Sequence, residues 1–107
     1  MIQVTAAQAQ ELIAAGDVEV IDVRDLSEWV GGHVPNARHL PLERLRSNAK
    51  VELARDGVVF VCAAGIRSQI AARIAESAGL KRVYNLSGGT QGWTRAGLPL
   101  DQNRSAA

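Results

Sequence analysis

The sequence has one cysteine, few aromatic residues and no long apolar run. A single cysteine excludes an internal disulfide and any metal site built from several cysteines. Because a lone thiol suits a reducing compartment, we expect a cytoplasmic location. No apolar stretch approaches the length of a membrane span. The first residues also lack the basic segment and apolar run of a signal peptide, so we expect neither a signal peptide nor a membrane partner.

Acidic and basic residues are balanced, and the charge pattern gives no sign of a polyanionic partner such as nucleic acid. Twelve basic and eleven acidic residues are mixed along the chain, with a formal net charge of +1. This pattern does not favour binding to nucleic acid or to an anionic membrane surface. The two histidines, His33 and His39, lack metal-ligand spacing with the cysteine or with grouped carboxylates. We therefore expect neither a metal nor another cofactor.

The length and the hydropathy pattern indicate one α/β domain. A chain of 107 residues that is 47% hydrophobic fits a single globular domain, with its core in residues 2–100 and a loose tail at 101–107. Apolar runs predict strands at residues 2–4, 18–23, 58–61 and 82–86. Helices are predicted at 6–15, 68–78 and 90–96, and at 42–53 in two pieces around 47–48. This alternation predicts a mostly parallel sheet.

Turn and cap signals mark several of these boundaries. Thr5 and Gln8 have the spacing of a capping box before the first helix. Ser27 is expected to cap a single helical turn through residues 28–30. Because ligands of parallel sheets bind at the carboxyl ends of the strands, the residues after strands 18–23, 58–61 and 82–86 are expected to converge at one edge.

The only cysteine, Cys62, comes directly after the apolar strand 58–61 and before a helix. The short loop into this helix leaves backbone N–H groups unpaired, and the helix dipole adds positive charge there. This environment should lower the pKa of a thiol. Arg67 adds a permanent positive charge, and Gly65 suits a loop with positive φ. The alternative is a buried cysteine that acts as a small hydrophobic residue.

Three groups of residues resemble the signatures of the rhodanese-like domain family, in the same order. The first group is Asp22-Val23-Arg24, Glu28-Trp29, Gly32-His33-Val34-Pro35-Asn36-Ala37 and Leu40-Pro41. The second is Cys62-Ala63-Ala64-Gly65-Ile66-Arg67-Ser68, and the third is Leu86-Ser87-Gly88-Gly89, Trp93 and Ala96-Gly97-Leu98-Pro99. The resemblance implies a rhodanese-like three-layer fold, in which a central, mostly parallel five-stranded sheet is flanked by helices.

The resemblance also implies a sulfurtransferase. The Cys62 thiolate would take a sulfane sulfur from thiosulfate or a persulfide donor and pass it to a thiophilic acceptor, such as cyanide or a thiol. The acceptor could also be a protein. The residues expected to bind the substrate or persulfide are Ala63, Ala64, Gly65, Ile66, Arg67 and Ser68. Arg67 would complete the cradle and orient an anionic donor, whereas Ser68 could instead be only a helix N-cap.

Two features depart from the family pattern. Asn36 stands where the family usually has glycine, and asparagine tolerates left-handed backbone better than other residues do. Ala63 and Ala64 are neutral, whereas members specialised for thiosulfate often have basic residues beside the cysteine. The second departure weakens the case for thiosulfate as the natural donor, without affecting the sulfur chemistry.

Two other functions compete with sulfur transfer. Cysteine-based phosphatases and arsenate reductases, some of which share this fold, have five residues between cysteine and arginine. Only four separate Cys62 from Arg67 here, a loop that suits a single sulfur atom better than an oxyanion. A non-catalytic module or a protein-docking persulfide relay is the other alternative, and the relay differs only in its acceptor. A thioredoxin-like role would need a second cysteine nearby.

The remaining polar and aromatic candidates are expected to be mainly structural. Asp22, Arg24 and Glu28 follow a strand end, where charged groups commonly form ion-pair networks. Trp29 and Trp93 are expected in the core or in the wall of a pocket, where shaping the entrance to the site is their functional alternative.

Overall fold

The structure is a computed structural model that describes residues 1–102. In chain order the elements are β1 (Ile2–Val4), α1 (Ala6–Ala14), β2 (Glu19–Asp22), α2 (Leu26–Val30), β3 (Arg38–His39), α3 (Leu42–Glu52), β4 (Val58–Val61), α4 (Arg67–Ser77), β5 (Val83–Leu86) and α5 (Gly89–Arg95). Each predicted strand and helix is confirmed to within a few residues. None of the helices in residues 1–102 is long and apolar enough to cross a membrane.

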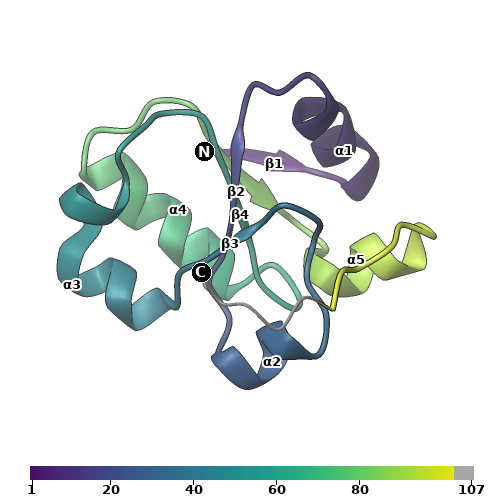
Figure 1. The fold of residues 1–107 in the computed structure, drawn as a ribbon. Helices are drawn as coiled ribbons and strands as arrows, with labels where there is room; N and C mark the ends of the chain where they lie inside the picture. Colours follow the sequence, from purple (N-terminus) through teal and green to yellow (C-terminus); the bar gives the residue numbers. More distant parts are fainter. Residues whose placement is uncertain (103–107) are drawn as a thin grey trace.

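The five strands form one sheet in the order β1-β5-β4-β2-β3, and each neighbouring pair is parallel. Helices α3 and α4 lie on one side of the sheet, and α1 and α5 lie on the other (Figure 1). The short helix α2 follows β2 and lies beyond the end of the sheet. The predicted three-layer α/β fold is therefore confirmed, and β4 is its central strand.

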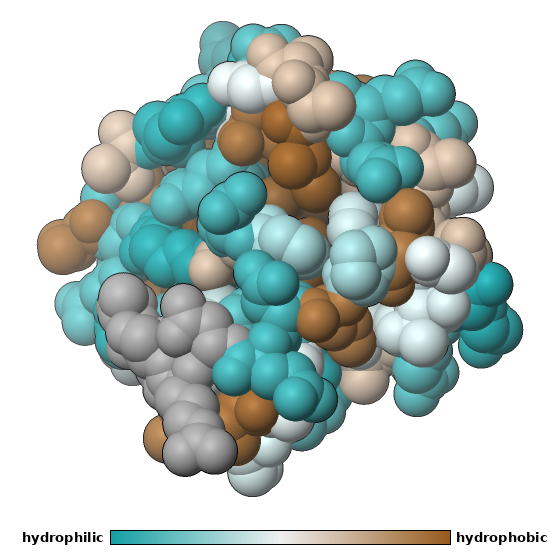
Figure 2. Space-filling model, turned by 45° about the vertical axis from the view of Figure 1, so that its right-hand side comes forward, coloured by the Kyte–Doolittle hydropathy of each residue, from teal (hydrophilic) through white to brown (hydrophobic). Residues whose placement is uncertain are grey.

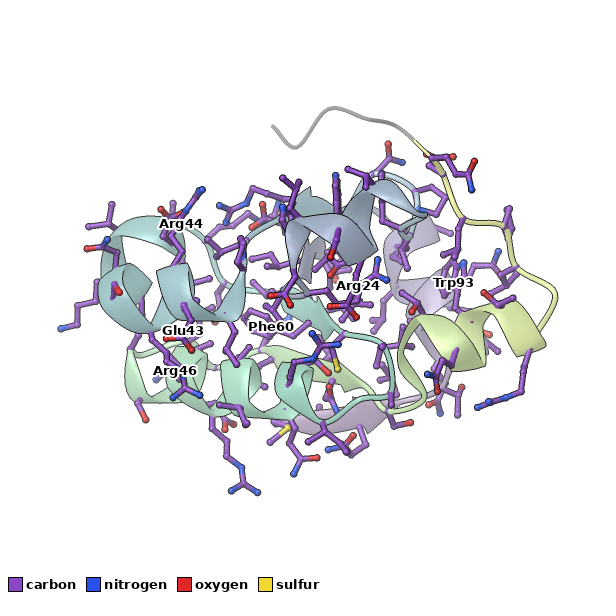
Figure 3. All side chains as sticks on the ribbon, turned by 90° about the horizontal axis from the view of Figure 1, so that it is seen from below. Arg24, Glu43, Arg44, Arg46, Phe60 and Trp93 are labelled. Atoms are coloured by element: carbon purple, nitrogen blue, oxygen red, sulfur yellow. The ribbon has the colours of Figure 1, made fainter. Side chains whose placement is uncertain are left out.

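The central strand shows why the sheet needs an apolar sequence. Val58, Phe60 and Cys62 contribute to the hydrophobic core that also contains residues of α3 and α4. Val59 and Val61 face the opposite way, into the core that includes residues of α1 and α5. Side chains alternate along a strand, so a sheet covered on both faces needs a continuous apolar run. Figure 3 shows Phe60 in the interior, and Cys62 continues its side of the alternation.

Helix α1 has the predicted capping box. The Thr5 N–H donates to Gln8 Oε1 at 2.9 Å, and the Gln8 N–H donates to Thr5 Oγ1 at 3.2 Å. The predicted break in α3 is also present, because Asn48 has non-helical backbone angles of φ −142° and ψ 42°. Asn36 has a φ of 66°, the left-handed conformation expected where the family usually has glycine.

Two local expectations were wrong. Asp25, and not Ser27, occupies the N-cap position of α2, where its N–H donates to Glu28 Oε1 at 3.2 Å. The predicted loose tail does not begin at Asp101, since the backbones of Asp101 and His33 exchange two hydrogen bonds of 2.8 Å. Residues 103–107 of that tail lie outside the described residues.

Exposed hydrophobic side chains are spread over several elements. The large ones include Ile2 on β1, Val51 on α3 and Ile66 before α4. The face seen in Figure 2 likewise carries separate hydrophobic patches between hydrophilic residues. Single hydrophobic residues of this kind are common on protein surfaces and do not by themselves define a binding face.

Candidate functional site

The thiol of Cys62 lies at the carboxyl end of β4, under the loop that leads into α4. The residue is only 1% exposed. The Gly65 N–H donates to Cys62 Sγ at 3.1 Å, and Ser68 Oγ lies 3.3 Å from the same sulfur. The loop therefore folds back over the sulfur and places polar groups of later residues against it.

These polar groups change the acidity of the thiol. Burial raises the pKa of Cys62, because it disfavours the charged thiolate. Hydrogen bonds from the Ser68 hydroxyl and from the backbone N–H groups of Ser68, Gly65 and Ala64 act in the opposite direction. Together they outweigh burial and lower the pKa of Cys62 below its ordinary value. This cradle needs no histidine as a base.

Helix α5 fixes the other side of the loop. The Thr90 N–H donates to the carbonyl of Cys62 at 2.8 Å, and the Gln91 N–H donates to that of Ala63 at 3.1 Å. The first residue of α5, Gly89, has a φ of 61°, and a Cβ on it would lie 2.3 Å from the Ala63 carbonyl oxygen. Only glycine allows this approach. The carbonyl groups of Cys62 and Ala63 therefore accept hydrogen bonds from α5, while the Gly65 N–H of the loop donates to the sulfur.

The interpretation of Ser68 as an N-cap was wrong. Ile66 is the N-cap residue of α4, and Ser68 lies inside the helix with no exposed surface. Its hydroxyl contacts Cys62 and donates to Asn85 Oδ1. Asn85 was not among the predicted residues. It occupies a position of β5 on the same face as Val83, so a polar residue at an inward-facing position was the signal that could have identified it.

Arg67 is held by a carboxylate from a distant part of the chain. Its Nη1 and Nη2 donate to Glu28 Oε1 and Oε2 at 2.7 and 2.9 Å. The hydrogen bonds to Arg67 are the main reason that the pKa of Glu28 falls to about 2, and the same pairing raises the pKa of Arg67. Both groups are therefore charged at neutral pH, and Glu28 neutralises the cation beside the loop.

Asp22 and Arg24 form the predicted ion-pair network. Arg24 Nε and Nη2 donate to the Asp22 carboxylate at 2.8 to 3.1 Å, and Nη2 also donates to the carbonyl of Gly32 at 2.7 Å. Asp22 is fully buried and Arg24 nearly so. The pair ties the end of β2 to the chain that leaves α2, and this positions the helix that carries Glu28.

The two tryptophans are core residues. Trp29 is buried and its ring stacks on that of His33, with centroids 3.5 Å apart and planes 2° from parallel. It also stacks less closely on His39, at 4.9 Å. Trp93 lies on α5 (Figure 3), where its Nε1–H donates to the carbonyl of Pro99 at 2.8 Å. Trp93 also lines a surface hollow beside the loop after β5, as a pocket-wall residue would.

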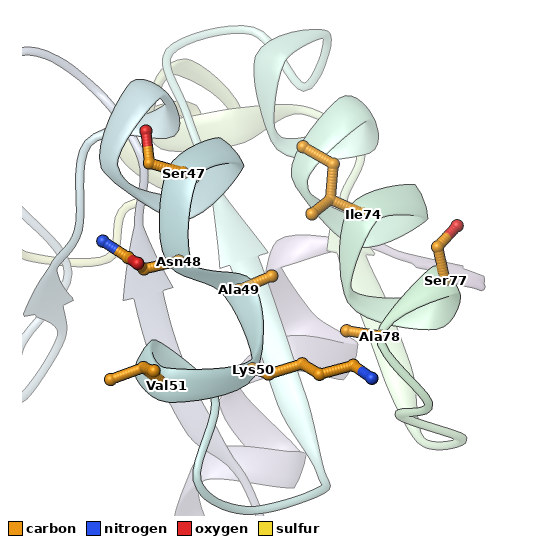
Figure 4. A pocket seen from close by; sticks show the side chains of 8 residues that line it. All are labelled: Ser47, Asn48, Ala49, Lys50, Val51, Ile74, Ser77 and Ala78. Carbon is orange, nitrogen blue, oxygen red and sulfur yellow. The ribbon is translucent and has the colours of Figure 1, made fainter.

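Another surface hollow lies between α3 and α4, at the end of α4 away from Cys62 (Figure 4). The residues that line it are Ser47, Asn48, Ala49, Lys50, Val51, Ile74, Ser77 and Ala78. These are mostly small or apolar side chains with one lysine. None of the groups that surround the thiol lines this hollow, so the hollow is separate from the loop around Cys62.

Comparison with known proteins agrees with this geometry. The model of the rhodanese-like domain family matches residues 5–96. Thiosulfate sulfurtransferase GlpE of Coxiella burnetii is 31% identical over 103 residues, which are 96% of this chain and 96% of that protein. The uncharacterized protein slr1261 of Synechocystis is 34% identical over 97 residues. The chain spans about half the length of two such relatives, 54% of slr1261 and 46% of YrkF from Bacillus subtilis.

Solved structures show the same fold. A rhodanese-related protein from Thermoplasma volcanium has a TM-score of 0.84 and 30% identity, over 96% of this chain and 100% of that one. A protein of unknown function from Rhodopseudomonas palustris, described as a possible tyrosine phosphatase, has a TM-score of 0.84 and 33% identity, over 94% and 85%. The family model covers most of the sequence and the fold matches throughout. The chain therefore belongs to the rhodanese-like domain family.

Proposed function

We propose that the protein is a sulfurtransferase in which Cys62 carries the sulfur as a persulfide. In the first half-reaction the thiolate attacks the outer sulfur of thiosulfate. A new S–S bond forms on Cys62, the S–S bond of thiosulfate breaks, and sulfite leaves with the electron pair. With a persulfide donor the leaving group is the donor's own thiolate. The observation that supports this step is the buried thiol under a hydrogen bond from Gly65 N–H.

In the second half-reaction a thiophilic acceptor attacks the outer sulfur of the persulfide. With cyanide, a C–S bond forms and the S–S bond to Cys62 breaks, so thiocyanate leaves and the thiolate is restored. The loop N–H groups supply the same stabilisation in both halves, because the resting thiolate and the persulfide are both anions. A protein thiol could replace cyanide, and the protein would then act as a persulfide relay.

Phosphatase chemistry is less well supported by the geometry. A phosphate ester needs several donors around a tetrahedral anion, and the four-residue loop between Cys62 and Arg67 is shorter than the loops of cysteine-based phosphatases. Arg67 is moreover engaged by Glu28 through both terminal nitrogens. One structural neighbour is described as a possible tyrosine phosphatase. A phosphate ester is therefore included in the test.

The test is the intact mass of the protein after incubation with thiosulfate, and separately with a small persulfide. We expect a gain of one sulfur atom, which cyanide discharges as thiocyanate. Because the chain has a single cysteine, the site of the modification is unambiguous. No gain from either donor by the folded protein, together with hydrolysis of an aryl phosphate, would contradict the proposal and favour the phosphatase.

Glu28 should lower kcat/KM for dianionic donors, because it neutralises the positive charge of Arg67. Replacing Glu28 with glutamine leaves the cation without its counter-charge. The Arg67 and Glu28 side chains are about one third exposed, so we use the dielectric constant of water. At an assumed separation of about 8 Å the change is then worth about 1 kcal/mol for a dianion and about half as much for a monoanion. We expect kcat/KM to rise about fivefold for thiosulfate and about twofold for benzenethiosulfonate. Steady-state rates with the two donors measure this difference.

Glu43 provides the matched control for this substitution. It forms an exposed ion pair with Arg46 on α3, with Arg46 Nε and Glu43 Oε1 3.1 Å apart, away from the loop (Figure 3). Glu43→Gln changes the net charge by the same amount and should leave both rates unchanged. Higher salt should also reduce the effect of Glu28→Gln. Equal gains for the two donors would show that the charge of Glu28 does not select between them.

A further inference from the structure

The hydroxyl of Ser68 lies between two buried groups that compete for its proton. Cys62 Sγ is 3.3 Å from Ser68 Oγ, and Asn85 Oδ1 accepts a hydrogen bond from the same hydroxyl. The three residues are at most 1% exposed. A serine hydroxyl has one proton and can donate to one acceptor at a time. Its direction therefore decides which of its two neighbours receives a donor.

The orientation of Asn85 is determined by its other contacts. Asn85 Nδ2 lies 3.1 Å from the carbonyl oxygen of Gly65 and 2.8 Å from Gln3 Oε1. A backbone carbonyl can only accept, so the amide nitrogen must face Gly65. The amide oxygen then faces Ser68 and needs a donor. The hydroxyl proton consequently points toward Asn85 when Cys62 is a thiol, and the S–H group can donate to Ser68 Oγ.

This arrangement satisfies every group only while the thiol is protonated. A thiolate has no proton to give and needs a donor instead. If the Ser68 hydroxyl turns toward the sulfur, the buried Asn85 Oδ1 loses its donor. If the hydroxyl does not turn, the thiolate faces an oxygen lone pair. Either outcome costs free energy, because an unsatisfied buried polar group is unfavourable.

We propose that Asn85 is a positioning residue that holds the Ser68 proton away from Cys62 and so limits how readily the thiol ionises. This proposal rests on the proposed function, in which the thiolate is the reactive form. The loop N–H groups favour the thiolate, and the Ser68 hydroxyl adds to them when it turns toward the sulfur. Asn85 competes for that hydroxyl and so reduces its contribution. Ionisation is thus coupled to the rotation of one buried hydroxyl.

The charged groups near the loop do not provide a competing switch. On α4 and α2, Arg67 and Glu28 are paired, and the pKa values of both are shifted away from neutrality. Asp25, before α2, acts on Arg67 at longer range. At the end of β2, Asp22 is paired with Arg24 inside the protein. The Ser68 hydroxyl is therefore the group near the sulfur that can change its hydrogen bond.

The test is the pKa of Cys62, measured from the pH dependence of its alkylation by iodoacetamide and from the ultraviolet absorbance of the thiolate. Asn85→Leu has a similar volume and no acceptor, which frees the hydroxyl for the sulfur. We expect the pKa to fall by about one unit, so that alkylation below the pKa is up to tenfold faster. In the Ser68→Ala background the same substitution should not lower the pKa.

A purely structural role for Asn85 predicts the opposite sign. Loss of its bond to Gly65 would loosen the loop, remove the donor to the sulfur and raise the pKa. An unchanged or raised pKa in folded Asn85→Leu therefore overturns the proposal. If that variant does not fold, Ser68→Ala decides. A rise of the Cys62 pKa by less than about one unit supports a hydroxyl held by Asn85, whereas a larger rise means that Ser68 donates freely to the thiolate and overturns the proposal.

Alkylation requires no sulfur donor, so its outcome is independent of sulfur transfer. If Asn85→Leu lowers the pKa but the wild type gains no sulfur, the positioning role holds and the proposed function fails. If the wild type gains sulfur but Asn85→Leu does not lower the pKa of Cys62, the proposed function holds and the positioning role of Asn85 fails.

Discussion

Replacing Cys62 with alanine should leave the protein folded and reduce sulfur transfer by at least about a thousandfold. The reason is chemical, since no other cysteine exists in the sequence to accept the sulfur. The substitution removes one buried sulfur atom from the core between the sheet and helices α3 and α4. The loss of packing should cost about 1 kcal/mol, which a folded domain tolerates.

Two measurements on the same preparation separate chemistry from stability. Thiocyanate formation from thiosulfate and cyanide gives the rate, and urea unfolding gives the free energy of unfolding. Cys62→Ser serves as a second variant, because it keeps a polar atom at the site but cannot form a persulfide. Transfer by either variant above the rate of the reagents alone would mean that another group carries the sulfur. Loss of transfer together with unfolding would not support a catalytic role.

The strand, loop and helix around Cys62 could be predicted because each has a local cause. The apolar run of β4 must be buried on both faces, and the helix after it has an apolar face of its own. The loop between them exposes N–H groups wherever a strand runs into a helix. The loop N–H groups beside Cys62 could therefore be expected from the sequence, although the residues of β5 and α5 that hold Gly65 against the sulfur could not.

The partner of Arg67 could not be predicted in the same way. Glu28 lies 39 residues earlier in the chain and is brought to Arg67 by the position of α2. That position depends on the buried pair of Asp22 and Arg24 and on the stacked ring of Trp29. The sequence indicated a charged network after β2, but it did not show which charges would pair. The expected role of Arg67 in orienting an anionic donor stays a prediction, and its pairing with Glu28 is what the structure adds.

Ser68 and Asn85 illustrate a different limit. A serine near a helix start is commonly a cap, so the sequence left that role open for Ser68 beside a role in the binding loop. The structure starts the helix two residues earlier, at the N-cap Ile66, and this turns Ser68 inward against the sulfur. Asn85 then supplies the acceptor from β5. This contact depends on the register of β5 against β4. The hydropathy pattern of one strand does not show which residues of another strand lie beside it.

Replacing Gly65 with alanine should destabilise the fold and disable the site together. Gly65 has a φ of 95°, and a Cβ on it would lie 2.1 Å from the carbonyl oxygen of Ser87. The Cβ is bonded directly to the backbone of the loop, and the oxygen belongs to the backbone of Ser87. Neither atom can therefore move without moving its backbone segment. Separating the loop from the end of β5 should cost about 3 kcal/mol or more. It should also raise the pKa of Cys62, because the Gly65 N–H would leave the sulfur.

Gly16 is the matched control for this substitution. Its φ of 73° is also left-handed, but a Cβ there would have no heavy atom within 4 Å. Gly16→Ala therefore measures the conformational strain alone, about 1 kcal/mol, and should leave transfer unchanged. The comparison uses urea unfolding and the pH dependence of alkylation for both variants. If Gly65→Ala costs no more than Gly16→Ala, the loop does not pack against Ser87. In that case the cradle around Cys62 would need another support, since the contact between the two loops is what places the Gly65 N–H against the sulfur.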